Sequence, residues 1–285
     1  MSVKPNRKFI LIGIGTLAVL VALYFISDSF RYVSTDNAQV DGHFVMLATK
    51  VGGYVEQVNI REGQKVKKDE ALVVIDGRDY ENNLRQVSGE LTSVEAKKID
   101  AEKSYHRISS LFSKGVVAQQ QYDSVSATFA DTKAKWDAVS AQVSQAKLNL
   151  ENTKIRAPSD GFIAKKAVEV GQLAAPGVPL IGFVDAHERW ITANVKETDL
   201  NRIRPGANVK VTVDALDSHT YQGKVETISS ATGATFTLLP PDNASGNFTK
   251  VVQRVPVRIR LENLSDKDLE ELRVGLSAYV KVSVH

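Results

Sequence analysis

Two stretches of the chain decide its fold: YENNLRQVSGELTSVEAKKIDAEKSYHRISSLF at residues 80–112 and YDSVSATFADTKAKWDAVSAQVSQAKLNL at residues 122–150. In both, apolar side chains recur at alternating steps of three and four residues, the spacing of a narrow stripe along one coiled-coil helix. In the first stretch, only Lys98 breaks the pattern. The seam residues that we expect between the two helices are Leu84, Val87, Leu91, Val94, Val125, Phe129, Trp136, Val139 and Val143.

The segment between the two stretches is short and contains Gly115, a residue type that commonly ends helices. So short a connection makes the two helices antiparallel neighbours. At ~1.5 Å per residue, each helix would be roughly 45 to 50 Å long. We therefore predict an α-helical hairpin over residues 78–153. Because it buries little except its own seam, we interpret it as a device for reaching a distant partner.

The composition excludes several classes of protein. Lys and Arg number 36 against 33 Asp and Glu, a balance too even for the basic surface of a nucleic-acid-binding protein. The chain has no cysteine, which excludes disulfides, thiolate metal sites and cysteine nucleophiles. A length of 285 residues is enough for two or three small domains.

The N-terminus has the pattern of a membrane anchor. The 18 residues from Phe9 to Ile26 carry no charge and follow a basic segment. Such a helix would span ~27 Å, close to the ~30 Å hydrocarbon core of a bilayer. We predict a cytoplasmic tail at residues 1–8 and a transmembrane helix at residues 9–27, because basic flanks favour the cytoplasmic side. The alternative is a cleaved signal peptide, although the apolar run is long for one and no A-x-A-like site follows it.

An internal repeat flanks the predicted hairpin. In each copy a glycine begins a short apolar strand, a second glycine follows ten residues later, and a leucine follows nine residues after that. These residues are Gly53, Gly63 and Leu72 in the first copy and Gly161, Gly171 and Leu180 in the second. Short strands broken by glycine turns form a unit too small to close a core alone. We therefore expect residues 45–77 and 154–186 to form one β-sandwich that the hairpin splits.

The repeat resembles the two halves of a biotinyl or lipoyl domain, whose acceptor lysine lies at the tip of a hairpin between the halves. Here the predicted helical hairpin takes that place, and no Met-Lys-Met or Asp-Lys-Ala tip is present. A split lipoyl-like domain with a helical hairpin, behind one membrane helix, is similar to the HlyD-type membrane fusion (periplasmic adaptor) proteins. The stretches TDNA at residues 35–38 and VQRVPVRI at residues 252–259 resemble the EmrA-like branch in particular.

The predicted turn of the hairpin resembles the motif RLxxLxxxxAISxxxxD, by which such adaptors dock on TolC-like outer-membrane channels. Arg107, Leu111 and Asp123 stand at the Arg, second Leu and Asp positions, and Val117 replaces the Ile. Ala118 stands where the family has Ser, so one hydroxyl contact with the channel is missing. The alternative is that Arg107 and Asp123 form only a surface ion pair across the hairpin mouth, which would contribute ~0 to 1 kcal/mol.

The C-terminal part, residues 187–285, changes to short strands separated by turns. We expect strands at residues 190–195, 209–213, 223–228, 251–261 and 278–284 and a short helix at residues 264–272. This pattern predicts a small β-barrel. Residues 31–49 are polar and show no period, so we assign residues 28–44 as a linker or strand toward the barrel. The predicted fold class is mainly β with an α-helical coiled-coil hairpin: an N-terminal transmembrane helix, a split lipoyl-like β-sandwich and a C-terminal β-barrel.

No pattern of a catalytic site is present in the sequence. The five histidines are scattered without metal-ligand spacing, and no glycine loop of a phosphate-binding type occurs. We therefore expect no enzymatic activity, no metal and no cofactor. The repeat alone would also suit a biotin or lipoate carrier module, which the missing acceptor lysine disfavours. The heptads alone would suit a coiled-coil scaffold, which the split repeat disfavours.

The resemblance implies a periplasmic adaptor of a tripartite multidrug efflux system, anchored in the inner membrane of a Gram-negative bacterium with its bulk in the periplasm. The implied partners are an inner-membrane transporter of the major-facilitator type, a TolC-like outer-membrane channel, and further copies of the chain in a trimer or hexamer. Service to an ABC exporter or a type I secretion system is the alternative. The sequence does not indicate the exported substrate, or whether so short a hairpin reaches the channel directly.

Overall fold

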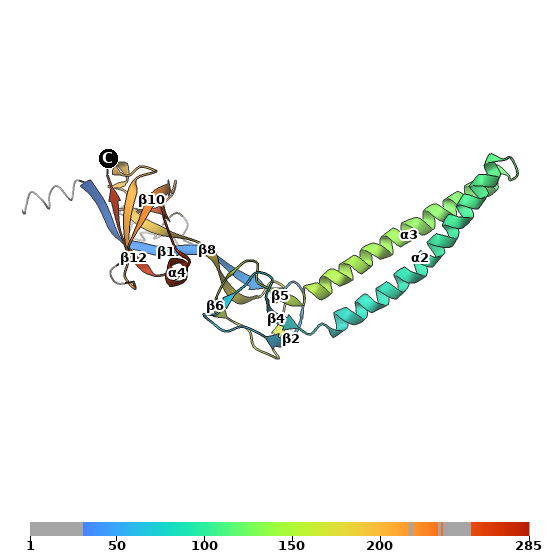
Figure 1. Cartoon of the computed structure of the whole chain (residues 1–285), viewed down its shortest axis with the longest axis horizontal. Helices are drawn as coiled ribbons and strands as arrows, with labels where there is room; N and C mark the ends of the chain where they lie inside the picture. Colours follow the sequence, from blue (N-terminus) through green and yellow to red (C-terminus); the bar gives the residue numbers. More distant parts are fainter. Residues whose placement is uncertain (1–30, 217–218, 233–234, 236–251, 285) are drawn as a thin grey trace, which may run out of the picture. The chain divides into compact units, whose positions relative to one another are not determined.

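A computed structural model of the chain describes residues 31–216, 219–232, 235 and 252–284 (Figure 1). The predicted transmembrane helix lies in residues 1–30, outside the described residues. Among the residues that are described, no helix combines the length and the hydropathy that crossing a membrane requires. The chain divides into two compact units, one built from the N-terminal segment up to His43 and the C-terminal segment from Asp185, the other from Phe44–Val184.

The first unit is a β-barrel. Its strands are β1 (Tyr32–Ala48), β8 (Pro179–Lys196), β9 (Asn208–Val213), β10 (Thr220–Ile228), β11 (Arg254–Leu261) and β12 (Ser277–Ser283). The strand order is β1-β12-β9-β10-β11-β8, and a pairing between β1 and β8 closes the ring. Along β9, Val209, Val211 and Val213 are buried and the residues between them are exposed, the alternation of a strand with one face on a core. The short helices η1 (Leu200–Arg202) and α4 (Asp266–Glu271) lie between barrel strands in the sequence.

β1 is a strand in the segment that the sequence predicts to be a linker or strand, and it continues beyond that segment to Ala48. This segment is a strand of 17 residues that pairs with β12. Its buried residues are Val33, Thr35, Ala38, Val40 and Gly42, and the pairing register shifts between Thr35 and Ala38. Such a shift is a β-bulge, which inserts an extra residue and breaks the period of two. The alternation that identifies a strand was therefore absent from the sequence.

The second unit contains the β-sandwich and the hairpin. The sandwich strands are β2 (Gly53–Val58), β3 (Lys65–Val66), β4 (Ala71–Ile75), β5 (Lys154–Arg156), β6 (Gly161–Lys166), β7 (Leu173–Ala174) and the first part of β8. One sheet has the order β5-β4-β2-β7, and β6 pairs with β3 and β8. The two repeat copies interlock, because β2 of the first copy pairs with β7 of the second and β3 pairs with β6. The strands of each copy therefore pair with strands of the other copy.

The four repeat glycines have two different roles. A Cβ at Gly53 would lie 2.6 Å from Cγ2 of Ile75, and one at Gly161 would overlap the ring of Phe183, so these two positions admit only a hydrogen. Gly63 and Gly171 have φ of +79° and +85°, the left-handed conformation that glycine adopts readily. The first glycine of each copy permits close packing, and the second permits a tight turn.

The hairpin consists of α2 (Arg78–Ser113) and α3 (Gln119–Glu151), inserted between the two halves of the sandwich. At 1.5 Å per residue, both arms are roughly 50 Å long. They run side by side from the sandwich to the turn (Figure 1). The predicted architecture, mainly β with a barrel and a helical hairpin, is confirmed for the described part of the chain.

Candidate docking site at the hairpin tip

The turn of the hairpin is a hydrogen-bonded helix stop. Just beyond the end of α2, Gly115 has a φ of +73°. The amide of Val116 donates to the carbonyl of Leu111 at 3.0 Å, and the amide of Gly115 donates to the carbonyl of Phe112 at 2.9 Å. These two hydrogen bonds make a Schellman motif, which gives the connection between α2 and α3 a defined path.

The five predicted docking residues lie around this turn. Arg107 and Leu111 are near the C-terminal end of α2, Val117 is in the turn, and Ala118 and Asp123 are at the start of α3. Arg107, Ala118 and Asp123 are exposed, whereas Leu111 and Val117 are half-buried. The tip therefore presents one cation and one anion beside partly covered apolar side chains.

Arg107 and Asp123 do not form the ion pair that was the alternative explanation for their presence. Asp123 accepts a hydrogen bond from Nε2 of Gln119, on its own helix, at 2.7 Å. Within the part of the chain that the structure describes, Arg107 has no carboxylate within ion-pair distance. The two charges contribute no contact between the arms, so both are available for a contact with another molecule.

Four aromatic rings lock the two arms together behind the tip. Phe112 stacks on Tyr122 with 4.9 Å between ring centroids, and Tyr105 stacks on Phe129 at 5.3 Å. The hydroxyls of Tyr105 and Tyr122 are 3.4 Å apart, and this hydrogen bond raises the pKa of Tyr122. All four residues belong to the apolar stripes of the two helices in the sequence. Which rings meet depends on how far one helix is shifted along the other, and the sequence does not define this shift. The rings determine that shift and so position the tip charges.

The nine predicted seam residues are all at least partly buried. Val139 is buried and the other eight are half-buried. Lys98, which broke the apolar stripe, places its Nζ 3.9 Å from the centroid of the Trp136 ring, a cation–π contact. Within the part of the chain that the structure describes, α3 is the helix that packs along α2, so two helices leave much of their seam at the surface. The hairpin therefore has apolar surface that further copies could cover.

Ala118 occupies the N-cap of α3. Its backbone is extended, with φ −71° and ψ 151°, and no side chain caps the helix there. A serine at an N-cap accepts a hydrogen bond from an amide of the first turn. The departure from the docking motif at this position therefore removes a helix cap as well as a hydroxyl at the surface.

Comparison with models of known protein families identifies the family of the chain. Residues 38–184, which hold the sandwich and the hairpin, match the model described as "RND MFP, barrel-sandwich hybrid domain". The chain belongs to the membrane fusion protein family. Residues 189–238 also match a model described as "CusB-like, beta-barrel domain", and this range contains the barrel strands β9 and β10.

The relatives of this membrane fusion protein include proteins named EmrA. It is 30% identical to the multidrug export protein EmrA of Haemophilus influenzae over 100% of this chain and 86% of that protein. It is 29% identical to the colistin resistance protein EmrA of Acinetobacter baumannii over 96% and 95% of the two chains. The solved structure of the periplasmic adaptor protein EmrA shares the fold, with a TM-score of 0.52 at 18% identity over 90% of this chain and 99% of that one. The resemblance to the EmrA-like branch is confirmed.

Proposed function

We propose that this membrane fusion protein is the periplasmic adaptor of a tripartite multidrug efflux system. A helix in residues 9–27 anchors it in the inner membrane with residues 1–8 in the cytoplasm, and both described units lie in the periplasm. It links an inner-membrane exporter to an outer-membrane channel. Family membership and the export function in the names of the EmrA relatives support this proposal.

The observation that carries the proposal is the build of the hairpin tip. A Schellman turn and four stacked rings hold the end of the hairpin, while Arg107 and Asp123 remain exposed and do not pair with each other. Among the residues that the structure describes, Arg107 has no ion pair and Asp123 has only a hydrogen bond within its own helix, and such exposed charges contribute little to stability. Arg107, Leu111, Val117, Ala118 and Asp123 therefore form the surface that docks on a TolC-like channel.

The exporter partner that we propose is of the major-facilitator type, as the resemblance to the EmrA-like branch implies. The barrel and the membrane anchor contact it. Glu197, at the end of β8, is exposed on the barrel and offers a point from which the exporter can be captured by crosslinking. Capture of an ABC exporter from this position would favour the alternative partner.

The assembly that we propose is a trimer or hexamer. The half-buried seam of each hairpin and the exposed Tyr54, Val170 and Leu173 of the sandwich offer apolar surface that neighbouring copies can cover. A closed ring buries such surfaces on every copy without forming an open filament. Sedimentation that finds only monomer in the presence of detergent and exporter would contradict this part of the proposal.

The adaptor carries out no chemistry in this account. The hairpin occupies the position at which a carrier domain presents its acceptor lysine, so a biotin or lipoate carrier role remains disfavoured. Intact-mass spectrometry of the purified chain tests this directly, because a carrier module would show a covalent adduct.

Charge reversal at the tip tests the docking role. Arg107→Glu and Asp123→Lys should each abolish drug export from cells while the melting temperature stays unchanged, because exposed charges contribute little to folding. Lys103→Glu is the matched control, since Lys103 is exposed on α2 about one turn before Arg107 and lies outside the docking motif. Normal export from both tip variants would remove docking from the proposed function.

A further inference from the structure

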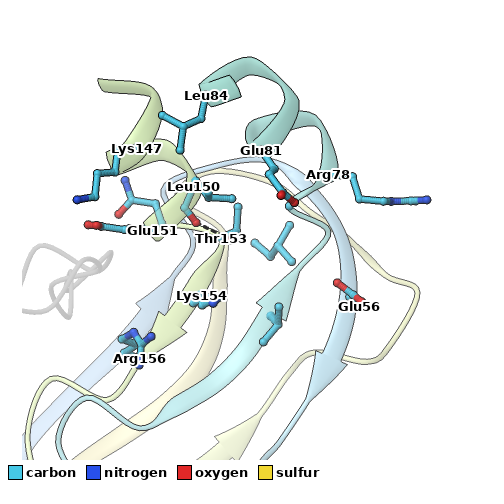
Figure 2. Close-up of a pocket in the computed structure, with 14 residues that line it drawn as sticks. Glu56, Arg78, Glu81, Leu84, Lys147, Leu150, Glu151, Thr153, Lys154 and Arg156 are labelled. Atoms are coloured by element: carbon cyan, nitrogen blue, oxygen red, sulfur yellow. Dashed lines mark hydrogen bonds between the residues drawn. The ribbon is translucent and has the colours of Figure 1, made fainter. Parts of the chain in front are cut away.

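A cleft of about 850 Å³ opens where the hairpin meets the sandwich (Figure 2). It lies between the first turns of α2 and the last turns of α3, above β4 and β5, and its apolar lining consists of Val74, Ile75, Leu84 and Leu150. Leu84 and Leu150 are half-buried, so this lining contacts water. Small-molecule sites typically measure ~300 to 1,000 Å³ and combine an apolar surface with a few charged groups.

The side of the cleft formed by α3 and β5 carries cations that no carboxylate neutralises. Figure 2 shows Lys147, Lys154 and Arg156 on this side, with Glu151 among them. Within the described chain, Lys147 and Lys154 form no ion pair. Arg156 donates to the backbone carbonyl of Asp69 at 2.7 Å rather than to a carboxylate. Three cations and one acidic side chain therefore line this side of the cleft.

On the opposite side, the charged residues of α2 that line the cleft are paired with neighbouring side chains. Nη2 of Arg78 lies 2.6 Å from Oδ2 of Asp76, and the hydrogen bonds from Arg78 lower the pKa of Asp76 to about 2. Glu81 lies 3.5 Å from the guanidinium of Arg85 on the same helix. Glu56, exposed on β2, also lines the cleft and forms no ion pair in the described part of the chain. The unpaired positive charge of the cleft is therefore concentrated on the α3 side.

We infer that this cleft binds an amphipathic anion. Its negative group lies against Lys147, Lys154 and Arg156, and its apolar body covers Leu84 and Leu150 on the cleft surface. The negative group of the ligand provides a partner for the three cations. The apolar body of the ligand shields the apolar lining of the cleft from water. A free amphiphile and a lipid that bears one acidic headgroup share this chemistry.

The inference goes beyond the proposed function and does not depend on it. The cleft lies within one chain, at the opposite end of the hairpin from the docking residues. Loss of ligand binding would leave channel docking possible, and loss of docking would leave the cleft intact. The two failures are therefore distinguishable.

Lysine footprinting tests the inference on the full chain in nanodiscs of zwitterionic lipid. Peptide mass spectrometry follows the rate at which a water-soluble reagent acetylates Lys147 and Lys154, with and without decanoate. We expect acetylation of both to slow at least fivefold with saturating decanoate. Lys133, exposed on α3 and outside the cleft, should react at an unchanged rate.

Two matched amphiphiles separate charge from hydrophobicity. Decanol and decyltrimethylammonium have the same chain length as decanoate, and neither should protect the two lysines. A parallel arm replaces decanoate with phosphatidylglycerol in the nanodisc. Protection in that arm would identify the bound anion as a membrane lipid, and protection by decanoate alone would identify it as a free amphiphile.

A double variant tests whether the two lysines are required for binding. Lys147→Glu combined with Lys154→Glu should weaken decanoate binding at least tenfold in titration calorimetry, after subtraction of protein-free nanodiscs, while Lys133→Glu should bind as the wild type does. Both altered lysines are exposed, so the variant should fold, and Lys147→Gln with Lys154→Gln provides a milder pair. Equal protection by decanol, no protection by either decanoate or phosphatidylglycerol, or wild-type affinity of the double variants for the anion that protects would overturn the inference.

Discussion

Replacing Gly161 with alanine should destabilise the sandwich strongly. The new Cβ would overlap the carbonyl oxygen of Val184 and the ring of Phe183, to whose Cε2 it would come within 2.6 Å. Phe183 is 1% exposed and so has no room to turn away, and the carbonyl belongs to the backbone of β8. Overpacking that side chains alone cannot relieve costs ~1 to 3 kcal/mol and sometimes more, so we expect a loss of about 3 kcal/mol.

Gly171 provides the matched control within the same repeat copy. A Cβ there meets nothing within 4 Å, and the only penalty comes from its φ of +85°. Alanine in a left-handed conformation costs roughly 1 to 2 kcal/mol. Gly161→Ala should therefore lower stability by about 1 to 2 kcal/mol more than Gly171→Ala. This difference is expected because a steric clash, and not a left-handed backbone, requires glycine at position 161.

Hydrogen exchange followed by mass spectrometry measures this difference locally. A chain with two units does not unfold in a single two-state step, so exchange of the β6 and β8 amides reports the sandwich better than a global melt does. The two variants should differ by about one order of magnitude in exchange rate, which corresponds to ~1.4 kcal/mol. Equal exchange in the two variants would refute the packing role that the structure gives to Gly161.

Three further changes test other parts of the structure. Leu91→Asp places a charge in the half-buried seam and should lower helicity and melting by circular dichroism; unchanged values would mean that the seam register is wrong. Ala118→Ser should stabilise the start of α3 by about 1 kcal/mol, because it completes a capping box with Gln121; unaltered exchange of the α3 amides near Gln121 would contradict this. Hydrogen bonds from Ser265 depress the pKa of Asp268. These bonds should therefore stabilise α4 above the usual pKa of 3.8, and the stabilisation should be lost as pH falls through the depressed value. Hydrogen exchange of the α4 amides should show this loss in the wild type but not in Asp268→Asn.

The hairpin and the barrel could be predicted because their patterns are local. Each hairpin helix has one neighbour, so its stripe steps regularly from Tyr80 to Phe112 without competing contacts. Barrel strands such as β9 alternate buried valines with exposed polar residues over a full strand length. In both cases the period of the elements survives in the sequence.

Other features could not be predicted, because they depend on how distant segments meet. The bulge after Thr35 removed the alternation of β1. The cation–π contact explains Lys98 only when Trp136 is known to lie opposite. The basic side of the cleft combines Lys147 of α3 with Lys154 of β5, and neither lysine belongs to a motif. The tip residues could be proposed from the sequence alone because the docking motif is contiguous across a short turn.

Site-specific photocrosslinking in Gram-negative cells tests the central claim most directly. A photoreactive residue at position 118 of the tip and, in a second strain, at position 197 of the barrel would report the partners of the two ends. The account predicts capture of a TolC-like channel from position 118 and of an inner-membrane exporter from position 197. Capture of only further copies of this chain, or of nothing, from position 118 would contradict an adaptor that docks on the outer-membrane channel.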